Sequence, residues 1–262
     1  MVPASDRATG PAKTSVWLAK GPERERGRRS GQPEGLGRDK IIEASVRLLD
    51  EHGTAAFSMR KLAAELDVTA MSLYWYVETK DDLLELALDA VFGDLSLPAP
   101  EDRADWRDRL RDLARTYRAL LVRHPWVSGL IGTFLNIGPN SLAFSRAVQE
   151  VVGASGLSPE ARMGGLAAVF QFVYGFGTIE GHFVQRCASA GLSQDEYFRR
   201  AMGTIEERPE LSREFEQATE IMEARGGTTV EEMRERDFAV ALDLLVAGIE
   251  AMVARRAPDK GP

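Results

Sequence analysis

The spacing of apolar residues changes abruptly near residue 38. Residues 1–37 are rich in Gly, Pro, Ser and Arg and show no apolar periodicity, which is typical of a disordered arm. From Arg38 onward, apolar positions recur with the period of an α-helix, and no alternating strand pattern of useful length follows. We therefore expect an all-α fold after an irregular N-terminal segment.

Start and stop signals divide the periodic region into helices. The first helix should begin at Arg38 and end at Gly53, because glycine commonly terminates a helix. Ser58 and Thr69 can cap two short helices, the second running through Tyr76, joined by a tight turn. Capping boxes at Thr79, Ser193 and Thr229 each predict the start of a further helix. Other helices are expected over 103–124, over 139–154, from Ser158 to about Ala188, and as a short piece that begins at Trp126. Residues 206–227 predict a polar stretch that is only loosely attached.

Composition places the chain among soluble globular proteins. Its 262 residues, 44% apolar and 28% charged, suffice for one medium or two small domains. The single cysteine, Cys187, excludes a disulfide framework and a four-cysteine zinc site. The most apolar stretch, residues 164–179, is interrupted by Gln171 and falls short of a membrane span, and no signal peptide is recognisable. We therefore expect a cytoplasmic protein.

The distribution of charge matters more than its sum. The formal net charge of −7 at first argues against a nucleic-acid partner. However, much of the acid lies beyond residue 100, whereas basic residues gather near the N-terminus at Arg24, Arg26, Arg28, Arg29, Arg38 and Lys40. The N-terminal region can therefore meet a polyanion. Residues 1–37 fit a tail without a role and an accessory DNA-contacting arm equally well.

Residues 58–80 carry the most informative pattern. They predict two short helices and a tight turn, held together by inward-facing Leu62, Leu66, Val68, Leu73 and Val77. The second helix presents small residues at its N-terminal end, and its adjacent aromatics Tyr74 and Trp75 cannot both face one core. Such a helix fits the major groove of DNA. The pattern therefore favours a helix-turn-helix.

This motif resembles the DNA-binding region of the tetracycline-repressor (TetR) family, and the resemblance extends over roughly residues 38–94. The run 73–77 followed by Lys80 is similar to the branch of the tetracycline repressors themselves. The resemblance implies a transcriptional repressor, not an enzyme, that binds a palindromic double-stranded operator as a homodimer and is released by a small-molecule effector. The implied domains are a disordered basic arm (1–37), a three-helix helix-turn-helix domain (38–84) and a helical effector-binding and dimerisation domain (85–257).

Position by position, the resemblance assigns roles to single residues. Arg60 would reach a guanine from the first helix of the motif, and Lys80 would bind a phosphate. Ala70 and Met71 stand where the tetracycline branch has glutamine and proline, and Tyr76 replaces its histidine, so the operator is expected to differ. The implied DNA-binding residues are Arg60, Thr69, Ala70, Met71, Ser72, Tyr74, Trp75, Tyr76 and Lys80.

The two longest apolar helices, from Ser158 and from Thr229, carry more apolar residues than one helix face within a monomer needs. The resemblance implies a four-helix dimer bundle, and a purely intramolecular core is the alternative. The residues expected at the interface are Leu166, Val169, Phe170, Val173, Ile179, Phe238, Ala241, Leu242, Leu245, Ile249 and Met252.

The same central helix mixes aromatic, polar and glycine residues, as a small-molecule pocket does. Gly175 and Gly177 either make room for a ligand or allow close helix packing. In the tetracycline branch, a histidine just before a glycine binds the magnesium ion that holds the drug. The matching Leu-Ile-Gly at 130–132 has no histidine, so we expect an apolar or aromatic effector and no metal or cofactor. The expected effector-binding residues are Trp126, Phe134, Asn136, Asn140, Phe170, Tyr174, Glu180 and His182.

Two other interpretations stay open from the sequence. A helical enzyme is one, although no nucleophile–base pair, metal cluster or phosphate loop is visible. The other is a DNA-binding protein without an effector, acting as a constitutive repressor or as an activator. If an effector exists, the helix from Thr79 joins the two domains and is the natural lever between them.

Overall fold

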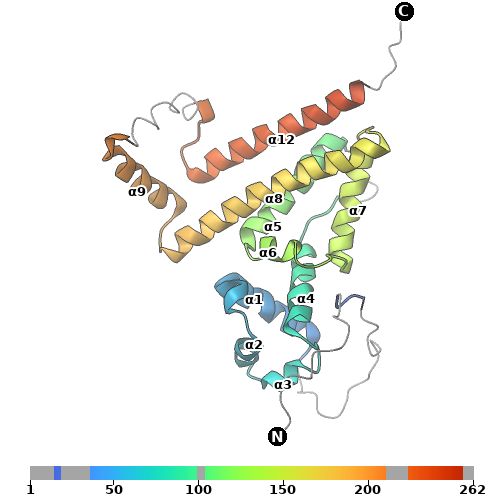
Figure 1. The fold of residues 1–262 in the computed structure, drawn as a ribbon, viewed down its shortest axis with the longest axis vertical. Helices are drawn as coiled ribbons and strands as arrows, with labels where there is room; N and C mark the ends of the chain where they lie inside the picture. Colours follow the sequence, from blue (N-terminus) through green and yellow to red (C-terminus); the bar gives the residue numbers. More distant parts are fainter. Residues whose placement is uncertain (1–14, 19–35, 99–103, 211–223, 256–262) are drawn as a thin grey trace, which may run out of the picture. The chain divides into compact units, whose positions relative to one another are not determined.

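The computed structural model describes residues 15–18, 36–98, 104–210 and 224–255. All regular elements within these residues are helices, which confirms the all-α expectation (Figure 1). The chain divides into two units, Met1–Leu95 with Trp126–Phe144 and Ser96–Pro125 with Ser145–Pro262. The helices are α1 (Arg38–Ala56), α2 (Met59–Glu65), α3 (Ala70–Leu73), α4 (Lys80–Phe92), α5 (Trp106–Arg123), α6 (Val127–Ile131), α7 (Pro139–Gly153), α8 (Pro159–Ser189), α9 (Gln194–Glu206) and α12 (Val230–Ala254).

Most helix ends follow the expected signals. Gly53 has a φ of +70° and interrupts α1 where the sequence predicted its end. At α12, Thr229 accepts a hydrogen bond from the backbone of Glu232, but the Glu232 carboxylate accepts from Thr228 instead of Thr229. The capping box expected there is therefore incomplete. Complete boxes are formed by Thr79 with Asp82 and by Ser193 with Glu196. Most of the expected arm and much of the 206–227 stretch lie outside the described residues.

Helix α4 is the centre of the first unit. Every residue from Asp82 to Phe92 except Ala90 is buried, and α1 and α6 pack against the helix. A helix buried on almost all sides has to be covered all round by other segments. The expected domain boundary between residues 84 and 85 falls inside this helix, whereas the structure keeps α4 whole in the first unit.

Residues 126–144 also belong to the first unit, although the sequence assigned them to the effector domain. The indole Nε1 of Trp126 donates to the carboxylate of Asp50 on α1 at 2.7 Å. The carboxylate of Asp89 on α4 accepts from the backbone nitrogen of Ser141, in the first turn of α7, at 2.9 Å. These contacts join residues that are 76 and 52 positions apart, which is why spacing along the chain did not predict them.

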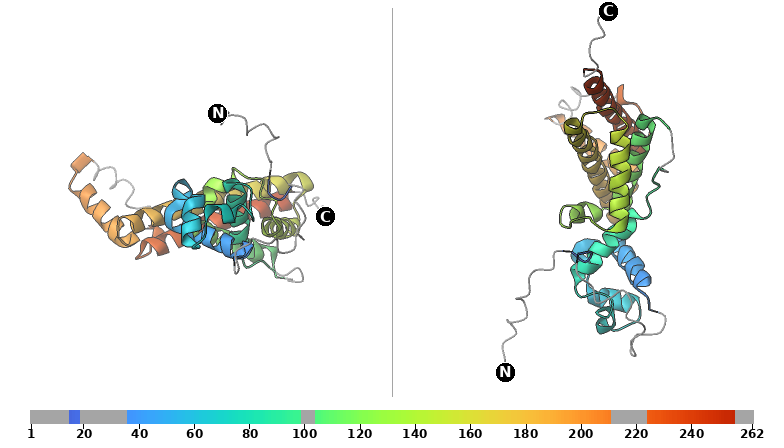
Figure 2. Two further views of the ribbon diagram at one scale, coloured as in Figure 1. Left: turned by 90° about the horizontal axis from the view of Figure 1, so that it is seen from below. Right: turned by 90° about the vertical axis from the view of Figure 1, so that its right-hand side faces the viewer.

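The second unit is built along α8, with α5 and α12 beside it (Figures 1 and 2). Phe172 and Phe176 of α8 pack against Phe238 of α12, with ring centroids 5.6 and 5.2 Å apart. On the side of α5, a Cβ at Gly177 would lie 3.0 Å from the Cβ of Leu121. Close helix packing is therefore the reason for Gly177.

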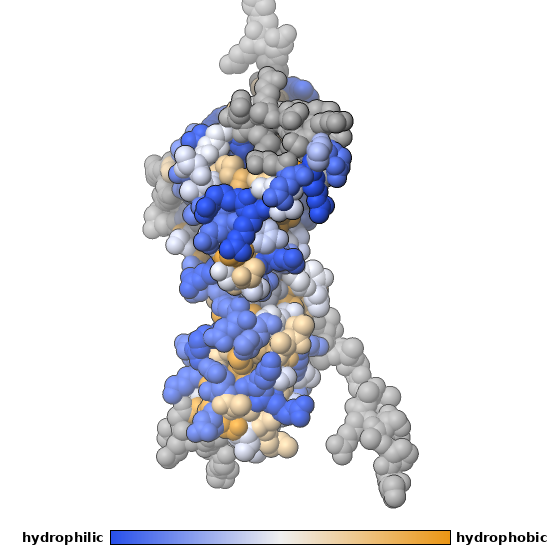
Figure 3. Space-filling view, turned by 90° about the vertical axis from the view of Figure 1, so that its left-hand side faces the viewer, coloured by the Kyte–Doolittle hydropathy of each residue, from blue (hydrophilic) through white to orange (hydrophobic). Residues whose placement is uncertain are grey.

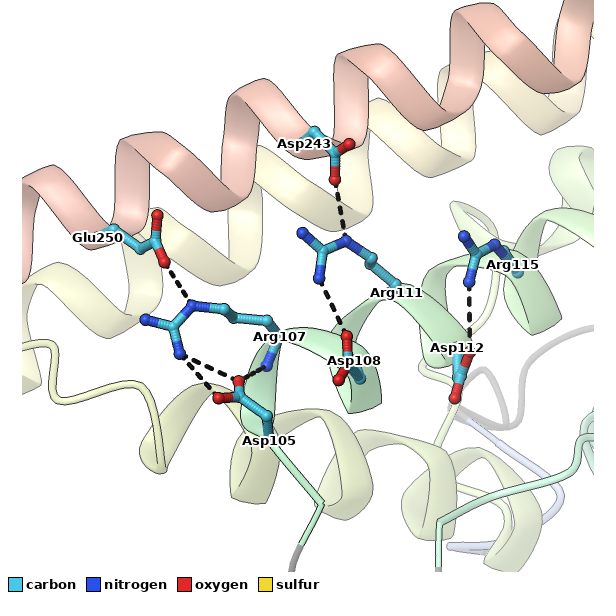
Figure 4. A network of polar contacts seen from close by, with 8 residues as sticks. All are labelled: Asp105, Arg107, Asp108, Arg111, Asp112, Arg115, Asp243 and Glu250. Atoms are coloured by element: carbon cyan, nitrogen blue, oxygen red, sulfur yellow. Dashed lines mark hydrogen bonds and ion pairs between the residues drawn. The ribbon is translucent and has the colours of Figure 1, made fainter.

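Ion pairs join α5 to α12 at the surface of this unit (Figure 4). Arg107 pairs with Glu250, and Arg111 pairs with Asp243 at 2.9 Å. The backbone N–H of Arg107 donates to Asp105, and this bond lowers the pKa of that carboxyl. Exposed pairs of this kind add little to stability, because water and salt screen their charges. The face drawn in Figure 3 likewise shows mostly hydrophilic side chains, with apolar ones in small patches between them.

The interface expected from the sequence is partly wrong. Five of its residues pack inside the second unit and are buried: Val169, Val173, Phe238, Leu242 and Ile249. They face inward because α5, α8 and α12 form a core within one chain. The large apolar side chains that α8 and α12 expose are Met163, Ile179, Val240, Leu244 and Met252, so the expected interface residues Ile179 and Met252 are exposed. We call the three exposed residues of α12 the apolar stripe.

Replacing Gly181 by Ala should destabilise the protein, although Gly→Ala inside a helix normally adds roughly 0.5–1 kcal/mol of stability. The new Cβ would lie 2.7 Å from the carbonyl oxygen of Leu121, so α5 and α8 would have to separate. The matched control is Gly203→Ala in α9, whose Cβ would meet no atom within 4 Å. Thermal melting should show a lower Tm for Gly181→Ala only. Equal Tm values for both variants would contradict this packing.

Candidate DNA-binding site

Helices α2 and α3 pack together and are held by local hydrogen bonds. Ser58 caps α2, and Thr69 caps α3. Between the helices, Asp67 has a φ of +53°, a conformation that aspartate tolerates better than most residues. The backbone nitrogen of Val68 then donates to the carbonyl of Ala63 at 2.9 Å and closes the turn. The structure therefore forms the helix-turn-helix that the sequence predicted.

The regular part of α3 is shorter than predicted. It ends at Leu73, whereas the sequence pattern extended the helix to Tyr76. Residues 74–76 continue the helical path with the tighter i→i−3 hydrogen bonds of a 3₁₀ turn, such as the bond from Tyr76 N to Leu73 O at 2.9 Å. The candidate contact residues therefore stay on one helical path.

The outer side of this path exposes large apolar side chains. Met71 is 71% exposed, Trp75 53% and Tyr74 47%, while Leu73 is fully buried on the inner side. Large apolar groups that are exposed together mark interaction surfaces. Of the other expected residues, Arg60 and Thr69 are exposed, and Ala70 and Ser72 are partly buried.

Tyr76 and Lys80 are engaged inside the first unit. The hydroxyl of Tyr76 donates to the carbonyl of Leu36 at 2.6 Å, just before α1. The Nζ of Lys80 donates to the carbonyl of Thr54 at 3.4 Å and lies 5.6 Å from the ring centroid of Phe57. Tyr76 thus joins the turn after α3 to a residue just ahead of α1, and Lys80 joins the start of α4 to α1. Their contacts with DNA stay predictions.

The residues expected to bind an effector are divided between the two units. In the first unit, the indole of Trp126 donates a hydrogen bond to Asp50, and the amide of Asn140 donates one to the backbone carbonyl of Asp89 at 3.1 Å. The amide of Asn136 donates to the carbonyls of Ile131 and Phe134, and its φ is +52°. The polar groups of these three residues hold the chain around α6, and Phe134 is partly buried.

In the second unit, the other four expected residues have different surroundings. The ring of Phe170 lies 6.1 Å from that of Tyr117, whose pKa is raised by burial. Tyr174 is partly buried and His182 is exposed. Glu180 is buried, and it is paired with an arginine that the sequence did not single out.

That arginine is Arg118 on α5. Its Nε and Nη2 donate to the two carboxylate oxygens of Glu180 at 2.7 and 3.0 Å, and its Nη1 donates to Glu235 at 2.5 Å. Burial alone would lower the pKa of Arg118, but the bonds and charges of the two glutamates outweigh it and raise the pKa. A signal was present in the sequence, because Ala114 and Leu121 place residue 118 on the buried face of α5.

A cavity of about 660 Å³ opens beside this arginine, between α5, α8 and the start of α12. Most of the residues that line it are charged, and Glu180 is the one expected effector residue among them. Within the described ranges, no group of three or more His, Cys, Asp or Glu is placed to hold a metal ion, and no helix is long and apolar enough to span a membrane. The cavity is lined by Arg115, Arg118, Ala119, Val122, Glu180, Thr229, Glu231, Glu232 and Glu235.

Family models match both parts of the chain. The model of bacterial regulatory proteins of the TetR family matches residues 41–87, and the tetracyclin-repressor-like C-terminal domain matches residues 97–253. The chain belongs to the TetR family of transcriptional regulators, which consists of regulators and not of enzymes.

Individual relatives agree with this family. An HTH-type transcriptional regulator of Saccharopolyspora erythraea is 45% identical over 53% of this chain, a match that spans 59% of the relative's own length. The HTH-type transcriptional repressor DrrR1 of Streptomyces coeruleorubidus is 28% identical over 86% of this chain and 81% of its own length.

Solved structures share the fold. ActR of Streptomyces coelicolor in complex with actinorhodin has a TM-score of 0.64 at 24% identity, covering 84% of this chain and 97% of ActR. BioQ with its double-stranded DNA operator has a TM-score of 0.53 at 21% identity, covering 82% of this chain and 99% of BioQ.

Replacing Arg118 by Met should destabilise the protein by roughly 3–5 kcal/mol, because Glu180 would remain buried and charged without its partner. The double variant Arg118→Met/Glu180→Leu removes both charges and should recover most of this loss. Urea unfolding of both variants measures the difference in the free energy of unfolding. A double variant no more stable than Arg118→Met would show that this pair does not hold the core.

Proposed function

We propose that the protein is a transcriptional repressor that binds a palindromic DNA operator as a homodimer, acts in the cytoplasm and is released by a small apolar or aromatic effector. The observation that carries the proposal is the outer side of α3. Met71, Tyr74 and Trp75 are exposed there, while Leu73 anchors the same turn in the core. A rigidly held short helix with an exposed outer side is what entry into the major groove requires.

Direct base contacts would come from the first turn of α3. Its N-terminal residues, Ala70, Met71 and Ser72, have small or flexible side chains that let the helix approach base edges closely. Arg60, exposed at the start of α2, would bind a guanine. Tyr74 and Trp75 would pack against the sugar–phosphate backbone. The structure of BioQ with its operator supports this mode of binding for the fold.

Replacing Arg60 or Trp75 by Ala should weaken sequence-selective DNA binding by about 10- to 100-fold each, as the loss of one base or groove contact does. Fluorescence anisotropy on a palindrome selected from a DNA library measures the affinity. The matched controls are Arg199→Ala on α9 and Leu135→Ala, both exposed and outside the motif at residues 58–80.

Wild-type affinity should also fall steeply as salt is raised, because binding releases counterions from the phosphates. Selective binding that survives in both variants would exclude α2 and α3 as the contact surface.

Once the operator is known, aromatic compounds can be screened for release of the DNA. The structure of ActR with actinorhodin supports a small-molecule ligand for this fold, and operator binding that no compound affects would favour a constitutive regulator.

The apolar stripe of α12 supports the homodimer. Val240, Leu244 and Met252 are separated by four and eight residues, so they share one face of α12. Leu244 is 70% exposed, and Ile179 on α8 is 71% exposed. A second copy of the chain can cover both helices at once and form a four-helix bundle, as the sequence analysis inferred.

Replacing Leu244 by Glu should weaken the dimer at least 100-fold, because each half of the interface would bury an unpaired carboxylate. Sedimentation equilibrium measures the dissociation constant. The matched control is Leu135→Glu, an exposed leucine of the first unit that lies outside the apolar stripe. If the two variants dimerise equally well, the interface is elsewhere.

A further inference from the structure

Two carboxylates on α4 are buried one helical turn apart. Glu85 and Asp89 are each 4% exposed, and neither forms an ion pair within the described residues. Carboxylates that lose their hydration need hydrogen-bond donors in its place. Asp89 takes its donors from the first turn of α7, the backbone nitrogens of Asn140 and Ser141. Glu85 needs donors from another segment.

Those donors come from residues 15–18, far ahead of the helix-turn-helix. The hydroxyl of Ser15 donates to Oε1 of Glu85, and the backbone nitrogen of Val16 donates to Oε2 at 2.7 Å. The segment turns back on itself, since the nitrogens of Trp17 and Leu18 donate to Ser15. Figure 1 shows this short piece, coloured dark blue, beside α4.

This docking departs from the disordered arm that the sequence predicted over residues 1–37. Ser15 is buried together with Glu85, 70 residues away in the chain. The segment also precedes the part of the chain, 41–87, that matches the DNA-binding family model. Docking of residues 15–18 on α4 is therefore a feature of this chain that the match does not include.

We propose that residues 15–18 are an intramolecular strap that holds α4 by donating hydrogen bonds to both carboxylate oxygens of Glu85, and that DNA affinity depends on the docked strap. This inference rests on the proposed DNA binding. Helix α4 starts directly after the motif and packs against α1, so its position sets how α2 and α3 are presented. When the strap leaves, Glu85 must regain water, and the buried side of α4 opens.

The variant Glu85→Gln separates this mechanism from simple charge effects. In this variant the amide oxygen can still accept from Val16 and the NH₂ group can donate to the Ser15 hydroxyl, but neither bond is then made to a charged carboxylate. The strap should therefore be held more weakly. DNA affinity should fall about tenfold, the scale of one lost hydrogen bond to a charged group.

The matched control is Asp81→Asn, the same change of charge at an exposed position of α4. Removal of a negative charge near a polyanion leaves affinity unchanged or raises it. The strap mechanism thus predicts that Glu85→Gln lowers DNA affinity, whereas Asp81→Asn, which changes the charge equally, does not. If Glu85→Gln matched Asp81→Asn in DNA affinity, the strap would have no part in DNA binding.

Two strap variants keep the test independent of α4 itself. Ser15→Ala removes the hydroxyl donor, and Val16→Pro removes the backbone donor, while Glu85 stays intact. Both should lower DNA affinity in the same direction as Glu85→Gln, with the α-helical circular dichroism of the wild type. Unchanged DNA affinity in both variants would overturn the proposal.

Hydrogen exchange measures the docking without DNA. The amide of Val16 should be protected in the wild type and in Asp81→Asn, and it should exchange at least about tenfold faster in Glu85→Gln. A wild-type protein that protects this amide but binds no DNA would refute the proposed function and leave the docking intact. Wild-type DNA binding with an unprotected Val16 would refute the strap alone.

Discussion

Buried charge on α4 has to be met by donors from other parts of the chain, and this requirement organises the first unit. Asp89 draws the start of α7 onto the helix, and Glu85 draws residues 15–18. Near α7, a Cβ at Gly138 would lie 2.2 Å from the Asp89 carboxylate, so only glycine fits there. The apolar residues of α4 favour burial of the helix, and the two carboxylates determine which segments cover it.

The DNA-facing helix depends on this support. Helix α3 has four regular residues, too few to be stable alone in water. It is held by its Thr69 cap, by the buried Leu73 and by the neighbouring segments that Tyr76 and Lys80 bind. Because this inner side is fixed, the outer side can keep Met71 and Trp75 exposed in a defined position for a partner.

The buried arginine of the second unit is neutralised by carboxylates of the same unit. Arg118 is paired with Glu180 and Glu235 and stacked on Phe238, 4.6 Å from its ring centroid. Glu180, which the sequence offered as an effector contact, therefore has a structural partner. Gly177 is explained by α5, whereas Gly175 faces open space within the described residues. Helix packing thus accounts for Glu180 and Gly177, two residues that the sequence suggested for a ligand pocket.

The sequence by itself determined the helical class, most helix ends and the helix-turn-helix, because these depend on hydrogen bonds and periodicity within a few residues. The capping box of Thr79 with Asp82 and the helix break at Gly53 both lie where the local pattern predicted them. Only the tertiary structure decided which apolar residues of α8 and α12 face outward, where α4 belongs and which partners Glu85 and Glu180 have. Those partners lie 62 to 70 positions away in the chain, and burial, not local spacing, brings them together.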